Sequence, residues 1–204
     1  MCIRDSRERA QWWGDEVNEL GEAFYALSPS GQKLAVKGIH ELMNWQREDG
    51  TLYAPVPAGN WDKELPLQML ASIGWYGFYT QYYYSADSSF VPVIYDRMRR
   101  YLHEVWQVDK SGLVIERQGA WSWGDWGEHV DMGVLTNCWY YLALKAERAF
   151  ALQLGKDKDA DEISRMMRSI ERCFDTKFWT GSAYRSPGYK AVSYTHLTLP
   201  TTSR

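Results

Sequence analysis

The sequence predicts an all-α fold, a partial α/α toroid with about three of the helical hairpins of a six-hairpin barrel. Apolar residues recur at helical spacing in six segments, and only brief extended pieces such as residues 113–117 lie between them. One of these segments is apolar nearly all round, which is typical of a helix surrounded by other helices. Six helices in three hairpins with such an interior member fit a ring in which outer helices cover inner ones.

Capping residues and turn signals set the expected helix boundaries. Ser28 and Pro29 suit the N-cap and the first position of the second helix. Gly155 suits the position just after the fifth helix. The first five expected helices cover residues 13–27, 29–48, 63–84, 88–106 and 131–154. The sixth follows Asp157 or Asp159 and ends in the segment from Phe174 to Trp179.

The third expected helix lies inside the longest uncharged run of the chain, from Leu65 to Ala86. About 20 apolar residues suffice to span a bilayer. This run, however, contains two glutamines, a proline, two glycines and five tyrosines, and no basic cluster flanks it. We therefore predict an interior helix and no membrane partner.

The composition narrows the class of function. The chain has 204 residues and a formal net charge of −3, and it has no basic run, so we expect no nucleic-acid partner. Three cysteines cannot form a disulfide framework, and the scattered His40, His103 and His129 do not have zinc-ligand spacing. We therefore predict no metal and no cofactor. The 11 tryptophans and 14 tyrosines suit packed helices, and they also suit a cleft that stacks sugar rings.

Both ends of the chain resemble translated sequencing adapter. The chain opens MCIRDS and closes VSYTHLTLPTTSR. A common transposon-end read translates as Met-Cys-Ile-Arg-Asp, and its reverse complement as Val-Ser-Tyr-Thr-His-Leu. We therefore assign residues 1–6 and 192–204 to adapter, keep residues 7–191 for fold reasoning, and expect the natural gene to continue on both sides. On this interpretation the sequence leaves the localisation and the export route open.

The first candidate site is the segment RERAQWWGD, from Arg7 to Asp15. A tryptophan such as Trp12 or Trp13 beside the carboxyl group of Glu8 would desolvate it and raise its pKa, so that it could act as a general acid near neutral pH. Arg7 would have the opposite effect if it paired with Glu8. A charged helix start with a tryptophan anchor explains the same residues, so composition alone leaves both interpretations open.

The second candidate site is the segment GAWSWGDWGEHVD, residues 119–131, with three tryptophans, three glycines and three carboxylates. Indole rings can stack on the C–H faces of a sugar, and carboxylates form strong hydrogen bonds to its hydroxyl groups. We expect Trp123, Asp125 and Trp126 to bind substrate and assign no role to Glu128. The same loop could plug one end of the toroid, and the two interpretations are compatible.

A third loop, APVPAGNWDKE over residues 54–64, offers Asn60, Trp61 and Asp62. These side chains could also face a sugar. We prefer to interpret Asp62 as the cap of the helix that follows.

At these residues the chain resembles a known family. RERAQWWGD resembles the signature D-x-P-x-R-E-[KR]-x-G-W-x-G-D of bacterial α-L-rhamnosidases, although Gln11 replaces a glycine and Ile3 stands where the leading aspartate would fall. WGDWGEH is similar to the G-D-W loop of the family. The resemblance continues through LTNCWYYLALKAERAFALQLGKDKDADEI and the segment from Phe174 to Trp179, so that it covers most of residues 7–191.

The resemblance implies a six-hairpin α/α toroid that hydrolyses terminal α-L-rhamnosyl bonds with inversion, acting on a rhamnosyl glycan or glycoside. It implies that Glu8 is the general acid and that Arg7, Trp12 and Asp15 bind the sugar. The general base would come from a hairpin beyond residue 191. Because inversion needs two carboxyl groups about 6.5–9.5 Å apart, we expect residues 7–191, the N-terminal half of the catalytic domain, to be inactive alone. The resemblance by itself favours a periplasmic or extracellular location.

Three alternatives remain. The chain could come from another toroidal glycoside hydrolase, which a panel of aryl glycosides would reveal. It could come from a glycan-binding protein that has lost the base, in which case the later hairpin would lack the glutamate. A purely structural helical domain would bind no sugar, and changes at Trp12 or Asp125 would have no effect.

Overall fold

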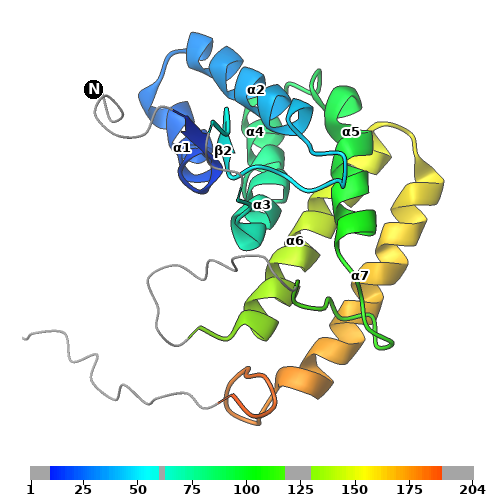
Figure 1. Ribbon diagram of the computed structural model, residues 1–204. Coiled ribbons are helices and arrows are strands. Elements are labelled where there is room, and N and C mark those ends of the chain that lie inside the picture. The colour runs from blue at the N-terminus through cyan, green and yellow to red at the C-terminus, as the bar shows by residue number, and fades with distance from the viewer. Residues whose placement is uncertain (1–9, 60–62, 118–129, 190–204) are drawn as a thin grey trace, which may run out of the picture.

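The computed structural model describes residues 10–59, 63–117 and 130–189, and these residues are mostly helical (Figure 1). This confirms the predicted all-α class. A two-residue ladder, β1 with β2, is the one sheet within the described residues. The elements are β1 (Gln11–Trp12), α1 (Trp13–Ala26), α2 (Pro29–Asn44), β2 (Pro55–Val56), α3 (Pro66–Ile73), α4 (Phe78–Ser85), α5 (Val91–Arg100), the π-helical turn η1 (Tyr101–Val105), α6 (Met132–Gln153) and α7 (Asp157–Phe178).

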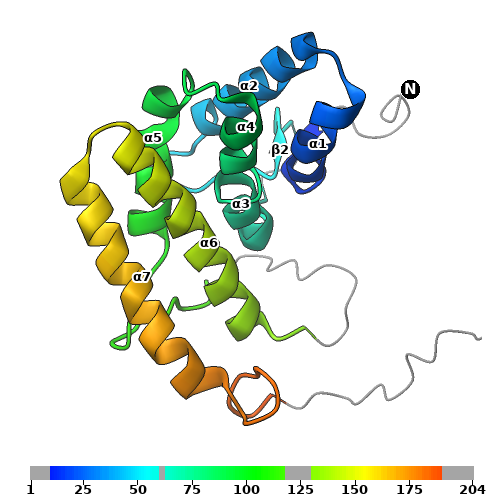
Figure 2. The ribbon, with the colours of Figure 1, turned by 180° about the vertical axis from the view of Figure 1, so that it is seen from behind.

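The helices form two layers. The inner layer consists of α1, α3 and α6, which contact one another in that order, and the outer layer includes α2 and α5, which also contact each other. Helix α7 packs along α6 and continues the outer layer (Figures 1 and 2). The chain therefore alternates between an inner and an outer arc, as expected for three hairpins of an α/α toroid. In Figure 1 each of α1, α3 and α6 begins at its own lower end, so the inner helices run in the same sense.

The expected helix over residues 63–84 is wrong as one element, because it is two helices, α3 and α4, separated by residues 74–77. Gly74 lies against the backbone of α6: a Cβ atom there would lie 2.5 Å from the carbonyl oxygen of Leu70 and 3.0 Å from the Cα atom of Ala143. A Cβ atom on Gly77 would collide with the carbonyl oxygen of Ser72. The break thus lets α3 approach α6 closely, and only glycine permits that approach.

The interior character of this segment is confirmed for α3 but not for α4. All residues of α3 are buried except Gln68, whereas Tyr83 and Tyr84 of α4 are more than half exposed. No helix among the described residues is long and apolar enough to cross a bilayer.

Helix ends agree with the sequence prediction where a local signal is strong. Ser28 is the N-cap of α2 with Pro29 at its first position, and Gly155 follows α6 with a φ of 69°. Helix α2 ends at Asn44, four residues before the expected end, because residues 45–50 form a turn that closes at Gly50 with a φ of 85°. Asp62, interpreted as a cap, lies outside the described residues, and α3 begins at Pro66 with Leu65 as its N-cap residue.

One hydrophobic core connects the two layers. Its largest fully buried side chains include Trp13 of α1, Tyr95 of α5 and Tyr140 of α6. The buried hydroxyl group of Tyr140 donates to the carbonyl oxygen of Leu102 over 2.9 Å. Every element from α1 to α7 contributes buried residues to this core, and α4 contributes only Phe78 and η1 only Tyr101 and Leu102. Trp12 of β1 is partly buried and packs against the core.

Candidate functional site

The segments that carry the sequence-predicted site residues each lead into an inner helix. Residues 7–12 precede α1, residues 51–65 precede α3, and residues 106–131 precede α6. The segments before α1 and α3 meet in the β1–β2 ladder, and Arg117, in the segment before α6, contacts Glu64 in the segment before α3. Trp12 and Asp15 belong to the described residues. Arg7, Glu8, Trp123, Asp125 and Trp126 lie outside them.

Trp12 and Asp15 occupy the start of α1. Trp12 is half-buried, pairs with Pro55 in the β1–β2 ladder and is the N-cap residue of α1. Asp15 lies in the first turn of α1 and is exposed. A carboxylate is favoured at that position by the partial positive charge of the helix N-terminus. The two residues thus stand three positions apart at the start of one helix, and their role in binding a sugar stays a prediction.

The start of α1 is held tightly against α3. The hydroxyl group of Ser72 lies 3.0 Å from the carbonyl oxygen of Trp13 and 2.7 Å from that of Gln68. A Cβ atom on Gly14 would lie 2.8 Å from the amide nitrogen of Gln68 and closer still to its carbonyl group. Gly14 therefore allows the close packing that fixes the orientation of its neighbour Asp15.

The loop before α3 is tied to the same point. The backbone N–H of Trp13 donates to the carbonyl oxygen of Ala54 over 3.0 Å, and the N–H of Ala54 donates to the carbonyl oxygen of Lys63 over 3.3 Å. The N–H of Leu52 donates to the Oε1 atom of Glu64 over 3.4 Å. The two ends of the 52–64 loop are thus joined to each other and to the first residue of α1.

A buried ion pair joins this loop to the segment that precedes α6. Oε2 of Glu64 lies 2.6 Å from Nη1 of Arg117, and the exposed fractions of the two side chains are 4% and 17%. The guanidinium of Arg117 lies 5.3 Å from the ring centroid of Trp106, a favourable cation–π distance. Tyr101 lies beside them: burial, and next the charge of Glu64, raise the pKa of its phenol well above the ordinary value. Tyr101 therefore stays neutral, and Arg117 supplies the positive charge beside Glu64.

Helix α6 fixes the position of Arg117 through Asn137. The buried side chain of Asn137 accepts a hydrogen bond from the N–H of Val114 over 2.8 Å and donates to the carbonyl oxygen of Val114 over 3.3 Å. It also donates to the carbonyl oxygen of Gly133 in α6 over 2.9 Å. The extended piece that ends at Arg117 is therefore anchored to the first turns of α6.

Asp131, the last carboxylate of the tryptophan-rich segment, is a helix cap. Its Oδ1 accepts from the N–H of Val134 over 3.2 Å, and its carboxylate accepts from the N–H and the hydroxyl group of Ser186, each over 2.5 Å. Burial alone would raise the pKa of Asp131, but the hydrogen bonds from Ser186 and Val134 outweigh it and lower the pKa. Asp131 is thus committed to structure, whereas Asp125 and Glu128 lie outside the described residues.

Sequence reasoning missed Glu64, Arg117, Asn137 and Ser72. A single glutamate and a single arginine far apart in the chain form no pattern, and the spacing of Ser72 indicates only a helix interior. Glu64 ends the 54–64 loop and Arg117 lies two residues before the 119–131 segment, but neither position indicates that the two side chains meet. No group of residues in the described parts of the chain could hold a metal ion.

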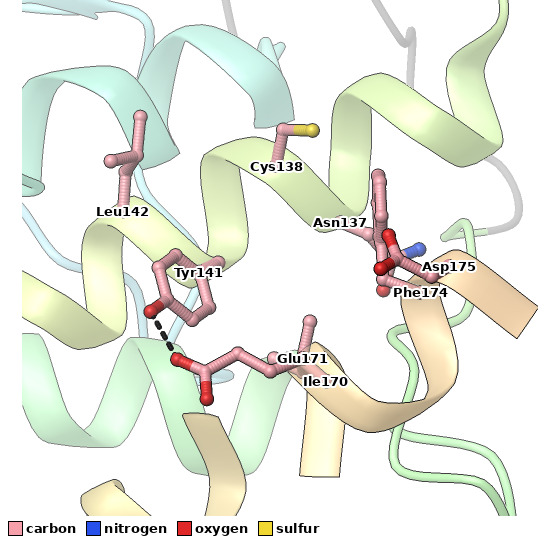
Figure 3. Close-up of a pocket in the computed structure, with 8 residues that line it drawn as sticks. All are labelled: Asn137, Cys138, Tyr141, Leu142, Ile170, Glu171, Phe174 and Asp175. Carbon is pink, nitrogen blue, oxygen red and sulfur yellow. Dashed lines mark hydrogen bonds between the residues drawn. The ribbon is translucent and has the colours of Figure 1, made fainter. Parts of the chain in front are cut away.

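A groove of about 460 Å³ lies elsewhere, between α6 and α7 (Figure 3). Its walls are mainly apolar, and across it the hydroxyl group of Tyr141 donates to Oε1 of Glu171 over 2.5 Å. It holds none of the predicted site residues. It is lined by Asn137, Cys138, Tyr141, Leu142, Ile170, Glu171, Phe174 and Asp175.

The two-layered arc of hairpins, with candidate loops at the start of its inner helices, defines the chain as part of an α/α toroid. The model of the bacterial alpha-L-rhamnosidase 6 hairpin glycosidase domain matches residues 4–202, and the chain belongs to this family. Among solved structures, the alpha-L-rhamnosidase from Dictyoglumus thermophilum is similar in fold, with a TM-score of 0.71 and 20% sequence identity. The match covers 87% of this chain and 20% of that chain, so the chain spans about a fifth of its length. No curated protein sequence matches the chain.

Proposed function

We propose that the protein to which this chain belongs is a glycoside hydrolase that removes terminal α-L-rhamnose from glycans or glycoconjugates with inversion. The observation that carries the proposal is the position of the Arg7–Asp15 motif. Its described residues Trp12 and Asp15 lie at the start of an inner helix, where β1 pairs with β2 of the loop before α3, and Glu64 of that loop contacts Arg117 in the segment before α6. Family membership supports the same activity.

In the proposed mechanism, Glu8 donates a proton to the glycosidic oxygen as the bond to the anomeric carbon breaks. A water molecule attacks that carbon from the opposite face and loses its proton to a second carboxylate, so that the anomeric configuration inverts. Arg7, Trp12 and Asp15 would hold the sugar through hydrogen bonds and ring stacking, together with Trp123, Asp125 and Trp126. Carboxyl groups and water suffice for this chemistry, so the proposal includes no metal and no cofactor.

We further propose that residues 7–191 are the N-terminal half of the catalytic domain and that the second carboxylate comes from a later hairpin. In the structure, the hairpin of α1 and α2 packs against α3 and α5, and these pack against α6. The groove between α6 and α7 would continue this series by accepting the next helical hairpin (Figure 3). The chain alone would then hold the acid without the base and would cleave no glycoside.

The proposal is tested with the longer natural protein and a panel of aryl glycosides: α-L-rhamnoside, glucosides and mannosides. We expect selective cleavage of the α-L-rhamnoside, with β-rhamnose as the first product in a proton NMR time course. Selective cleavage of another sugar would assign the protein to a different activity of toroidal hydrolases. No cleavage by a folded protein that binds rhamnose would favour a glycan-binding function.

A further inference from the structure

We propose that Glu64 and Arg117 are positioning residues, whose buried ion pair holds the sugar-binding elements in register with one another. The inference rests on the proposed function. It concerns the contact between the end of the loop before α3 and the residue that precedes the tryptophan-rich segment. Neither Glu64 nor Arg117 is among the residues assigned to binding or catalysis.

The ion pair is connected to Trp12 through residues 52–56. Glu64 accepts the N–H of Leu52, and two residues further on Ala54 accepts the N–H of Trp13. The next residues of this strand, Pro55 and Val56, pair with β1, which contains Trp12. A displacement of Glu64 would therefore move the strand against which the Arg7–Asp15 motif is fixed.

The ion pair is also connected to the segment before α6. Arg117 is the last described residue before the tryptophan-rich segment, and Asn137 of α6 holds the piece that leads to it. The ion pair therefore connects the residue just before this segment to the last residue of the 54–64 loop.

The ion pair is largely buried. The side chains of Glu64 and Arg117 are 4% and 17% exposed, and the rings of Tyr101 and Trp106 lie beside the pair. An ion pair shielded from water in this way has few alternative geometries, since leaving it would strand a buried charge. It thus fixes the distance between the two chain segments that carry Glu64 and Arg117 more rigidly than a surface ion pair could.

The chain contains a matched control for a purely structural effect. Glu147 of α6 is fully buried and lies 2.9 Å from Nε2 of His103 and 3.4 Å from Nη1 of Arg99. It resembles Glu64 in burial and in having an arginine partner. It stands fifteen residues after the start of α6 at Met132, about 22 Å along the helix and away from the candidate loops.

The experiment measures kcat, KM and the thermal midpoint in the longer natural protein with an aryl α-L-rhamnoside as substrate. The variants are Glu64→Gln, Arg117→Met, the double variant and the control Glu147→Gln. The double variant leaves no unpaired buried charge, so it stays informative if a single variant folds poorly. We expect KM to rise about tenfold in all three pair variants, no further in the double than in the singles, with kcat changed less than about threefold. The control should lower the thermal midpoint and leave KM unchanged.

A KM that stays at the wild-type value in the pair variants, or rises equally in the control, would overturn the inference. If the wild-type protein cleaves no rhamnoside, the proposed function fails, and amide hydrogen exchange then tests the positioning role. Exchange at residues 52–54 and 114–117 should accelerate about tenfold in Glu64→Gln and not in Glu147→Gln. Equal rates in the wild type and Glu64→Gln would overturn the inference by this second route.

Discussion

The hydroxyl group of Ser72 on α3 lies 3.0 Å from the carbonyl oxygen of Trp13, the first residue of α1. Ser72 is fully buried, so the contact connects the start of the motif helix to the neighbouring inner helix without competition from water. We expect Ser72→Ala to lower the free energy of unfolding by about 1–2 kcal/mol, since a buried hydrogen bond is lost. Chemical denaturation monitored by circular dichroism measures this.

The control for Ser72→Ala is Thr176→Ala. The hydroxyl group of Thr176 also donates to the carbonyl oxygen four residues earlier, in this case that of Arg172, but it is exposed. We expect Thr176→Ala to change the free energy of unfolding by less than about 0.5 kcal/mol. An equal loss in both variants would show that the contact between α1 and α3 contributes nothing.

Two glycines of α1 should respond in opposite directions to alanine. A Cβ atom on Gly21 has room, with the Cγ2 atom of Thr80 at 4.0 Å, so Gly21→Ala should stabilise the helix by about 0.5–1 kcal/mol. Gly14→Ala should instead destabilise the protein by about 1–3 kcal/mol, because the new methyl group displaces the amide of Gln68. Denaturation of both variants under identical conditions checks the difference. Stabilisation by Gly14→Ala would contradict the packing described for the motif helix.

Asp109 should stabilise the fold in a pH-dependent way. Hydrogen bonds from the hydroxyl group of Ser111, then from Lys177, Ser111 N–H and Leu113 N–H, outweigh its burial and lower its pKa to about 2 from 3.8. Because the folded-state pKa lies below the unfolded-state value, this stabilisation is present above 3.8 and is lost as the pH falls towards 2. Partial exposure limits it to about 1 kcal/mol.

The measurement compares the wild type with Asp109→Asn by denaturant unfolding at neutral pH and at several acidic values. The gap between their free energies of unfolding should shrink between pH 3.8 and about 2. Asp96→Asn, which removes a carboxylate from a side chain that is 86% exposed, serves as the control. A gap for Asp109→Asn that does not change with pH would exclude the carboxylate charge as its origin.

The groove between α6 and α7 predicts a difference between this chain and the longer protein. Cys138 lies in the groove wall and is exposed here (Figure 3). If the next hairpin covers the groove, a thiol reagent should modify Cys138 in this chain and react at least about tenfold more slowly in the longer protein. Because the groove leaves apolar surface uncovered, we also expect this chain alone to unfold at low temperature and without a sharp transition. Equal reactivity in both proteins, or a sharp cooperative melt of this chain, would contradict the proposed docking.

The fold could be predicted from the sequence because its signals are local. The apolar stripe of α7 and the Ser28–Pro29 start of α2 depend only on neighbouring residues in the chain. The break between α3 and α4 could not be predicted, because Gly74 is required by the approach of Ala143, which is distant in sequence. A run of uncharged residues predicts that the segment is buried, but it does not indicate which helix will pack against it.

The candidate site could be predicted only in part, and the rest stays a prediction. The Arg7–Asp15 motif is identified by resemblance, and the structure adds where its described residues Trp12 and Asp15 stand. The pair of Glu64 and Arg117 is invisible in the sequence, since its existence depends on how the loops before α3 and α6 meet. Asp131, a carboxylate of the same tryptophan-rich segment, caps α6, in agreement with the expected start of that helix.

The most direct test of the account is the effect of Glu8→Gln on rhamnoside cleavage by the longer natural protein. Loss of a general acid should lower kcat by about 10²–10⁴-fold, and by more for an alkyl rhamnoside than for a nitrophenyl rhamnoside, whose leaving group needs less protonation. Glu41→Gln, which removes a surface carboxylate paired with Lys37, should leave kcat unchanged. Full activity of Glu8→Gln on the alkyl rhamnoside would contradict the assignment of Glu8 as the acid.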